Sequence, residues 1–281
     1  MTEHGEAARE VFEVISNNDP GIPYTPVAII LDKYAGYNAY QGRPWGTLDP
    51  TPGDQEIMDL FQHQIFPGSD HVHQPFDPEN PEKTYLPATP YGEMFDVHLS
   101  NARTEVLSAY PVLILVGDHE LDLQFITKLH TALRAGSQLL IHPRHAEQLG
   151  DNLQRLQGTG HVEILESEIL PSTQRPTAIT HCKLANLRDT WLPVKIEGDP
   201  IQYQVNQTPN GWMIELVNPA GALKSPTQPA RIDSTQTANV RVTFKTIPNR
   251  VWLLGSEEEF VSQSTYKLSI PPGETRFLIG N

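Results

Sequence analysis

The chain has 281 residues, 38% of them hydrophobic, which is enough for about two domains with buried cores. Its 20 Lys and Arg against 34 Asp and Glu give a formal net charge of −14. So acidic a chain is repelled by phosphate backbones and by anionic lipids, and we therefore expect neither a nucleic acid nor a membrane as its partner.

The chain carries one cysteine, Cys182, and no run of about 18 apolar residues. The single cysteine excludes an intrachain disulfide framework and a metal site built from several thiolates. The first six residues lack the basic start and the apolar core of a signal peptide. We expect a cytoplasmic protein, or a secreted one if this chain is the tail of a longer protein.

Helix and strand patterns alternate in the first part of the chain. Apolar residues at helical spacing predict a helix over 6–18, and a continuous apolar run predicts a strand over 26–31 that is buried on both faces. The runs 112–116 and 138–142 have the same character. Between them, apolar residues repeat every three to four positions from 121 to 133, which predicts a helix.

Strand, helix and strand in that order, with Gly136 as the helix C-terminal glycine, predict a right-handed parallel crossover. A further helix is expected over 54–65 and a further strand over 162–165. We therefore predict a three-layer, flavodoxin- or amidotransferase-like α/β domain with a parallel sheet over residues 1–170. The proline-rich segment 67–91 fits neither pattern, and loops of such length tend to be functional or disordered.

The pattern changes after residue 170. Apolar and polar residues alternate over 212–216, 240–244 and 266–270, with turn residues between these stretches, and we find no helical period. Short strands separated by turns over about 100 residues are typical of an antiparallel β-sandwich. We therefore predict a β-sandwich domain over residues 171–281.

Polar residues follow the predicted parallel strands at their carboxyl ends, where ligands bind in open α/β sheets. These residues are Asp32, Tyr34, Asp118, His119, Glu120 and His142. They form a candidate binding crevice with carboxylates and imidazoles. Alternatively, Asp118 and Glu120 cap the helix that begins near Leu121, because carboxylates favour the free N–H groups of a helix start.

The segment after the first strand is rich in aromatic residues. Tyr34, Tyr37, Tyr40 and Trp45 lie between glycines and offer flat, amphipathic rings. Such rings stack on sugar faces or fill the pockets of a partner protein. The alternative is that they pack over the edge of the chain's own sheet.

Motifs of several enzyme classes are missing. The turn at 117–120 carries no Cys or Ser nucleophile, and neither G-x-S-x-G nor a glycine-rich phosphate loop occurs. His71 and His73 could face one side of an extended segment, but without further ligands a solvated loop is the better interpretation. We therefore assign no catalytic residue, no metal ligand and no cofactor.

Several strings nevertheless resemble a known family. Segments 26–32, 89–97, 110–118 and 211–224, with Pro-Pro-Gly-Glu at 271–274, are similar to the post-barrel region of beta-galactosidase-like glycoside hydrolases, which include glycoside hydrolase family 42. In that clan a catalytic (β/α)₈ barrel precedes an amidotransferase-like trimerisation domain and a small β-sandwich. The resemblance implies a homo-oligomer, or a partner chain that carries a glycoside-hydrolase barrel.

The catalytic barrel itself has no counterpart in this sequence. A barrel needs about 250 residues, and the two predicted domains already account for the chain. Three hypotheses follow. The chain is a non-catalytic accessory or oligomerisation module in carbohydrate metabolism, a carbohydrate- or small-molecule-binding protein that uses the crevice, or a hydrolase with a site in that crevice. If the chain is part of an enzyme, we expect a glycoside hydrolase.

Overall fold

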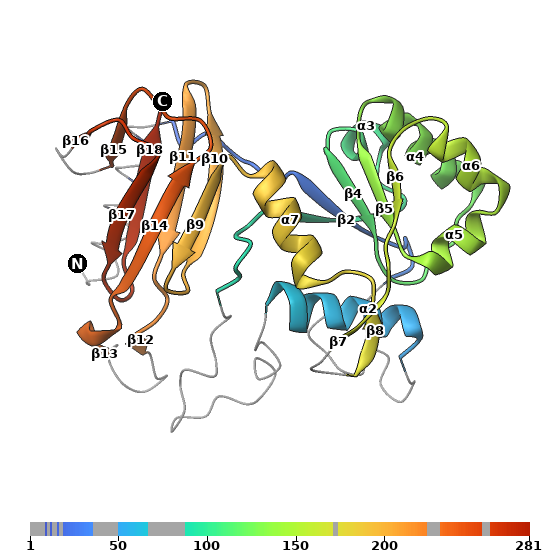
Figure 1. Cartoon of the computed structure of the whole chain (residues 1–281), viewed down its shortest axis with the longest axis horizontal. Helices are drawn as coiled ribbons and strands as arrows, with labels where there is room; N and C mark the ends of the chain where they lie inside the picture. Colours follow the sequence, from blue (N-terminus) through green and yellow to red (C-terminus); the bar gives the residue numbers. More distant parts are fainter. Residues whose placement is uncertain are drawn as a thin grey trace.

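A computed structural model describes residues 19–35, 50–66, 88–170, 174–223, 231–254 and 259–281, together with Arg9, Phe12 and Ser16. Figure 1 shows two bodies side by side, an α/β domain and a β-sandwich. This confirms the predicted fold class. Of the predicted helix over 6–18, only the three single residues are described, and all three are helical. No helix in the described ranges has both the length and the apolar character needed to cross a bilayer.

The α/β domain is built on a five-stranded parallel sheet. In spatial order its strands are β3 (Phe95–Leu99), β2 (Val27–Leu31), β4 (Val112–Leu115), β5 (Gln138–Ile141) and β6 (Val162–Ile164). Numbered along the chain this order is 2-1-3-4-5, the flavodoxin-like arrangement. The four predicted strands are confirmed, and β3 is an additional edge strand that the continuous apolar runs did not indicate.

Both faces of this sheet are covered by helices, as buried strands of continuous apolar sequence require. In β2, Val27, Ile29 and Leu31 face one side and Ala28 and Ile30 face the other. The first side is covered by α2 (Pro52–Asp59), the π-helical turn η1 (Leu60–Ile65) and α7 (His181–Trp191). The other is covered by α3 (Thr104–Leu107), α4 (Leu123–Arg134), α5 (Pro143–Leu149) and α6 (Asp151–Gln157).

Helix α4 shows how local sequence sets the boundaries of an element. Its N-cap is Asp122, whose Oδ1 accepts a hydrogen bond of 2.7 Å from the N–H of Phe125. Gly136 follows the helix with φ of +104°, as predicted for its C-terminal glycine. The proposed capping by Asp118 or Glu120 is therefore wrong, because the helix begins two residues later than Leu121.

The second body contains two antiparallel sheets and confirms the predicted sandwich. The larger sheet runs β1 (Ile22–Pro23), β10 (Gln202–Thr208), β11 (Gly211–Val217), β18 (Thr275–Gly280), β15 (Val251–Leu253), β16 (Glu259–Phe260). The smaller runs β17 (Thr265–Ile270), β14 (Ala238–Phe244), β9 (Val194–Gly198). Shorter elements are β7 (Glu168–Leu170), β8 (Arg175–Thr177), β12 (Ala222–Leu223), β13 (Arg231–Ile232) and the 3₁₀ turn η4 (Ser234–Gln236). All three alternating stretches of the sequence lie in strands.

The two bodies share core residues. Helix α7 lies between them in Figure 1, and its Leu184 and Leu187 are buried in one cluster with Ile57 of α2 and Val194 of β9. The expectation that no helix follows residue 170 is therefore wrong. Strand β1 precedes the parallel sheet in sequence yet pairs with β10. A segment on the N-terminal side of the α/β domain therefore belongs to the larger sheet of the sandwich.

Candidate ligand-binding sites

The loops after β2 and β4 meet where the strand order reverses, which is the usual ligand position in this fold. Here the two loops bind each other. Asp32 accepts hydrogen bonds from the backbone N–H groups of Tyr34 at 2.8 Å and of Glu120 at 3.0 Å. Lys33 Nζ lies 3.0 Å from carboxylate oxygens of both Glu120 and Asp122. The predicted crevice residues therefore come together, but Asp32 is 7% exposed and occupied by the chain's own backbone.

The predicted aromatic segment is described only at its start. Tyr34 is 74% exposed, and Lys33 Nζ lies 5.1 Å from the centre of its ring. Tyr37, Tyr40 and Trp45 lie outside the described residues, as does most of the predicted loop 67–91. The binding role of this segment stays a prediction.

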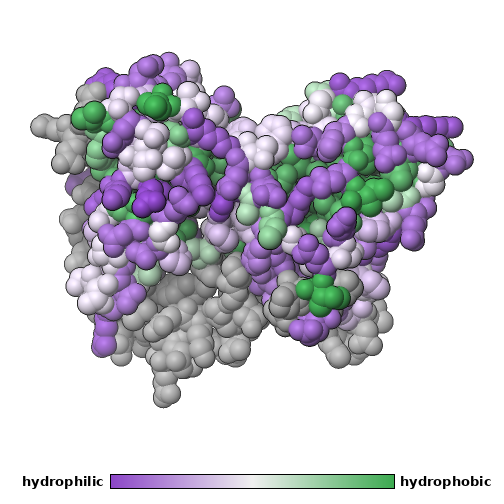
Figure 2. Space-filling model, viewed as in Figure 1, coloured by the Kyte–Doolittle hydropathy of each residue, from purple (hydrophilic) through white to green (hydrophobic). Residues whose placement is uncertain are grey.

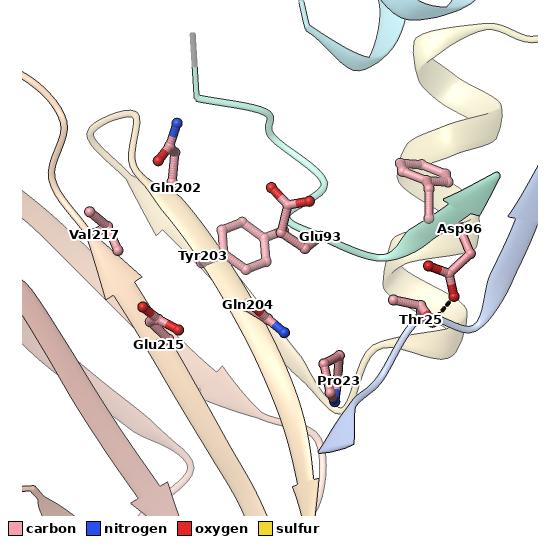
Figure 3. Close-up of a pocket in the computed structure, with 10 residues that line it drawn as sticks. Pro23, Thr25, Glu93, Asp96, Gln202, Tyr203, Gln204, Glu215 and Val217 are labelled. Atoms are coloured by element: carbon pink, nitrogen blue, oxygen red, sulfur yellow. Dashed lines mark hydrogen bonds between the residues drawn. The ribbon is translucent and has the colours of Figure 1, made fainter. Parts of the chain in front are cut away.

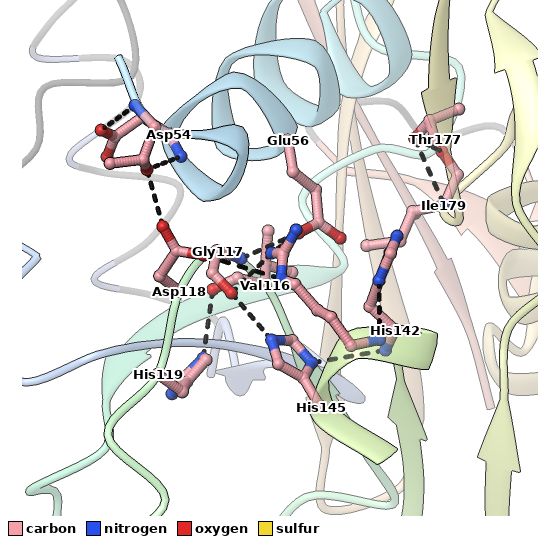
Figure 4. A network of polar contacts seen from close by, with 12 residues as sticks. Asp54, Glu56, Val116, Gly117, Asp118, His119, His142, His145, Thr177 and Ile179 are labelled. Atoms are coloured by element: carbon pink, nitrogen blue, oxygen red, sulfur yellow. Dashed lines mark hydrogen bonds and ion pairs between the residues drawn. The ribbon is translucent and has the colours of Figure 1, made fainter. Parts of the chain in front are cut away.

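Helix α2 packs against the loop after β4, which forms part of the crevice (Figure 4). Thr51 caps this helix by accepting from the Asp54 N–H, and its hydroxyl donates to Asp118 Oδ2 at 2.6 Å. Gly53 permits the close approach, because a Cβ at this position would lie 2.3 Å from Asp118 Cγ. The start of α2 therefore rests directly on the loop after β4.

Glu56 connects the same helix to the loop after β4 and to Arg144 of α5. Its carboxylate is buried, pairs with Arg144 Nη2 and accepts from the Gly117 N–H at 3.2 Å. Arg144 Nη2 also donates to the Gly117 carbonyl at 2.6 Å. Burial raises the pKa of Glu56 to about 7, while the charge of Arg144 acts in the opposite direction. Helix α2, the β4 loop and the start of α5 are thereby fixed to one another.

Three histidines complete this network. His145 Nε2 donates to the Gly117 carbonyl at 2.8 Å, and its Nδ1 accepts from the His142 N–H at 3.3 Å. Burial lowers the pKa of His145 to about 3, so the ring is neutral. His119 Nε2 lies 3.1 Å from the carbonyls of Ile30 and Val116, and burial lowers its pKa as well. His142 caps α5, with its Nδ1 accepting from the Arg144 N–H at 3.2 Å.

These contacts give the crevice a structural role. Asp32, His119 and His142 each bond to backbone groups, and Asp118 bonds to Thr51. The side chains of Asp118 and Glu120 remain 53% and 57% exposed. That any of these residues binds a ligand stays a prediction.

A hollow lies at the end of the parallel sheet opposite the crevice, between the α/β domain and the sandwich. We call it the interdomain groove. Figure 2 shows the notch between the two bodies, and Figure 3 shows the groove from close by. Its volume is about 420 Å³. It is lined by Pro23, Thr25, Glu93, Phe95, Asp96, Gln202, Tyr203, Gln204, Glu215 and Val217.

Asp96, at the α/β wall of the groove, is already bonded. Its Oδ2 accepts from Thr25 Oγ at 2.5 Å and from the Tyr110 hydroxyl at 2.7 Å. The Tyr110 hydroxyl also lies 2.8 Å from His98 Nε2. Burial, reinforced by Asp96, raises the pKa of Tyr110, which keeps the phenol protonated and able to donate.

Glu93 and Glu215 differ from Asp96. Glu215 is partly buried and Glu93 is more exposed, and partial burial raises the pKa of each carboxyl. Within the part of the chain that the structure describes, neither carboxylate has a hydrogen-bond or ion-pair partner, and the same holds for the side-chain amides of Gln202 and Gln204. The groove thus presents four polar side chains with free hydrogen-bonding capacity.

Sequence reasoning missed these groove residues. Gln204 and Glu215 face each other across β10 and β11 and alternate with buried Val205 and Ile214, so they resemble the solvent side of any amphipathic strand. Glu93 belongs to a string that carried the family resemblance, but nothing local distinguishes it from a surface acid. These residues line one groove only because the two domains pack next to each other.

In the described ranges, no three His, Cys, Asp or Glu side chains lie close enough together to hold a metal ion, in the crevice or in the interdomain groove. The arrangement in the groove suits hydrogen bonding to a small molecule, and the arrangement in the crevice suits internal stabilisation.

No protein-family model matches this sequence, and a search of curated proteins gives no match. Comparison with solved structures shows a shared fold with the first of the three that follow. An alpha-L-fucosidase isoenzyme 2 from Paenibacillus thiaminolyticus superposes with a TM-score of 0.51 at 13% identity, covering 98% of this chain and 51% of that chain. A rhamnosidase from Novosphingobium sp. PP1Y gives 0.40 at 15% identity, covering 66% and 19%. A GH42 beta-galactosidase from G. stearothermophilus gives 0.42 at 11%, covering 96% and 42%.

The fucosidase superposition shows a shared fold over nearly all of this chain. The chain spans about half the length of that protein. At such low identity the likeness carries fold and not activity, and the scores of the other two structures are too low to add to it.

Proposed function

We propose that this chain is a non-catalytic accessory module related to glycoside hydrolases, which acts by associating with a second copy of itself or with a chain that carries a glycoside-hydrolase barrel. The observation that carries the proposal is the fucosidase superposition, in which almost the whole chain corresponds to about half of an enzyme. A fold that is part of an enzyme in one protein can act as a companion in another.

The distribution of the described residues supports the non-catalytic part of the proposal. They form an open parallel sheet and antiparallel sheets, and the longest stretch outside them, 67–87, is far shorter than the ~250 residues of a barrel. The acids of the crevice are engaged in internal contacts, so the fold's usual ligand position does not offer the two free carboxylates that a glycosidase needs.

The edge strand β3 is the described surface that best fits association. It ends the parallel sheet, so its outer backbone groups lack a neighbouring strand in the described ranges. Val97 and Leu99, on this strand, are 49% and 37% exposed. An added strand from a second chain would pair with these backbone groups and cover both side chains.

Size-exclusion chromatography with light scattering tests self-association directly. We expect a dimer or larger species whose population rises with concentration, and we expect Val97→Lys to shift it toward monomer, because the edge would then carry a charge. A strict monomer at high concentration would leave only the barrel-chain form of the proposal, which co-purification with a coexpressed barrel chain tests.

The absence of catalysis is tested with 4-nitrophenyl glycosides, including the α-L-fucoside and the β-D-galactoside. We expect no turnover by the purified chain. Turnover that disappears in a Glu215→Gln or a Glu93→Gln variant would contradict the proposal and make the chain a hydrolase.

A further inference from the structure

We propose that the interdomain groove binds a neutral saccharide, with Glu93, Glu215, Gln202 and Gln204 as its hydrogen-bonding groups. This goes beyond the accessory function proposed above, since a module can associate with other chains without binding any small molecule. The proposal rests on the shape of the groove, on the free polar groups in it and on its charge.

The shape of the groove suits a small ligand. Its volume of about 420 Å³ lies within the ~300–1,000 Å³ of ordinary small-molecule sites. Gln202, Gln204 and Glu215 stand on the paired strands β10 and β11, which hold them in fixed register. Glu93 is tied to the same sheet, because its N–H donates to the Tyr203 carbonyl at 3.0 Å. The backbone positions of these four residues are therefore fixed before a ligand arrives.

The free polar groups point to a ligand with many hydroxyls. Carboxylates only accept hydrogen bonds, whereas side-chain amides both donate and accept. Glu215 is partly buried and Glu93 is more exposed, and neither carboxylate has a partner among the described residues, so both can accept hydrogen bonds from a ligand. Adjacent hydroxyls satisfy both kinds of group. Phe95 and Val217 add apolar surface to the lining, suited to the C–H faces of a sugar ring.

The charge of the groove selects among polar ligands. Among the described residues, Glu93, Asp96 and Glu215 line it and no Lys or Arg does, so an anionic ligand is repelled. A cationic amine would be attracted to the carboxylates, but its N–H groups only donate and would leave the N–H donors of Gln202 and Gln204 unused. A neutral polyhydroxylated molecule uses all four groups.

Isothermal titration calorimetry of the full chain tests the proposal. The neutral probes are L-fucose, D-galactose, D-glucose, D-mannose and D-xylose, and the charged probes are D-glucuronate and spermidine. We expect saturable binding of at least one neutral sugar with a Kd on the order of 1 mM. We expect Glu215→Ala to weaken that binding at least tenfold, and the conservative Glu215→Gln to weaken it less.

The matched control is Glu274→Ala. This glutamate lies outside the groove, where its carboxylate pairs with Arg276 at 2.6 Å, and we expect its replacement to leave sugar affinity unchanged. Circular dichroism checks that each variant is folded. If Glu215→Ala fails to fold, Gln204→Ala provides the same test from the neighbouring strand.

Three results would overturn the proposal: no neutral probe binds, spermidine alone binds, or a neutral sugar binds with equal affinity to the Glu215 and Gln204 variants. None of these affects the light-scattering and turnover tests of the accessory function. A monomeric chain that binds sugar at this groove would conversely count against self-association and leave the saccharide site in place.

Discussion

Two polar regions of this molecule, the crevice and the interdomain groove, use similar residue types in opposite ways. At the carboxyl ends of β2 and β4, acids, an arginine and histidines bond to one another and to the backbone, with Glu56 and Arg144 at the centre. In the groove at the amino ends of β2 and β3, the carboxylates of Glu93 and of Glu215, which stands on β11 of the sandwich, have no partners among the described residues. At the fold's usual ligand position the polar groups are engaged in internal contacts, whereas in the interdomain groove several are not.

This difference shows that residue type alone does not identify a site. A polar group with an internal partner contributes to stability, and removing the partner leaves a buried group unsatisfied. A polar group without an internal partner contributes little to folding and is free to meet a ligand. The two regions should therefore respond oppositely to substitution.

The largest effect is expected from Arg144→Met. The substitution leaves the buried Glu56 carboxylate without its cation, and breaking such a pair typically destabilises by about 3–5 kcal/mol. Urea unfolding at a pH of about 8 measures the loss. Because protonation of Glu56 removes the unpaired charge, we expect the deficit to shrink as the pH falls toward about 6.

The double variant Glu56→Met with Arg144→Met is the matched control. With both charges replaced by apolar side chains, we expect much of the lost stability to return, although the Gly117 N–H and carbonyl lose partners. A single variant within about 1 kcal/mol of the parent would mean that the crevice is not held by this pair. The comparison of the two regions would then fail.

A smaller effect is expected from His145→Gln, measured as a function of pH. The folded-state pKa of His145, about 3, is below its ordinary value of 6.5, so its contribution to stability is present above about pH 6.5 and is lost as the pH falls. Glutamine can still donate to the Gly117 carbonyl but does not titrate. The parent's stability advantage should narrow by about 2 kcal/mol between roughly pH 6.5 and 5, at about 1.36 kcal/mol per pH unit for one proton.

Thermal and urea unfolding of both proteins across this range give the two curves. Comparing them cancels the contribution of Glu56, whose raised pKa acts in the opposite direction because its stabilising effect is lost as the pH rises. Parallel curves would indicate that the pKa of His145 is the same in the folded and unfolded states, contrary to the effect of its burial.

Sequence patterns sufficed for much of the fold. Strands β2 and β4 consist of continuous apolar residues buried on both faces, as does β5 after Gln138, and Gly136 ends α4 as its position indicated. Helix α7 was missed although Leu184 and Leu187 are spaced as a helix face and Thr180 caps it. With only these two residues fully buried, its period was too weak to stand out beside the strand patterns.

The candidate sites were less predictable, for physical reasons. The strand ends placed Asp32, Asp118 and Glu120 together, because neighbouring parallel strands deliver their loops to one edge. The engagement of Asp118 and of the Gly117 backbone depends on α2 and on Arg144, whose docking on this loop no local pattern encodes. Glu93 and Glu215 are 122 positions apart and meet only through the packing of the two bodies.

The smallest effect is expected from Glu215→Gln in the groove. Burial raises the pKa of Glu215 above its ordinary value, so the charged form is disfavoured in the folded state, and the parent's stability declines as the pH rises through that pKa. The amide does not titrate, and we expect the variant to gain less than about 1 kcal/mol near neutral pH, since water screens a half-exposed group. A loss of more than about 1 kcal/mol in urea unfolding would show that this carboxylate has a structural partner, as Glu56 does, and would remove the difference between the two regions.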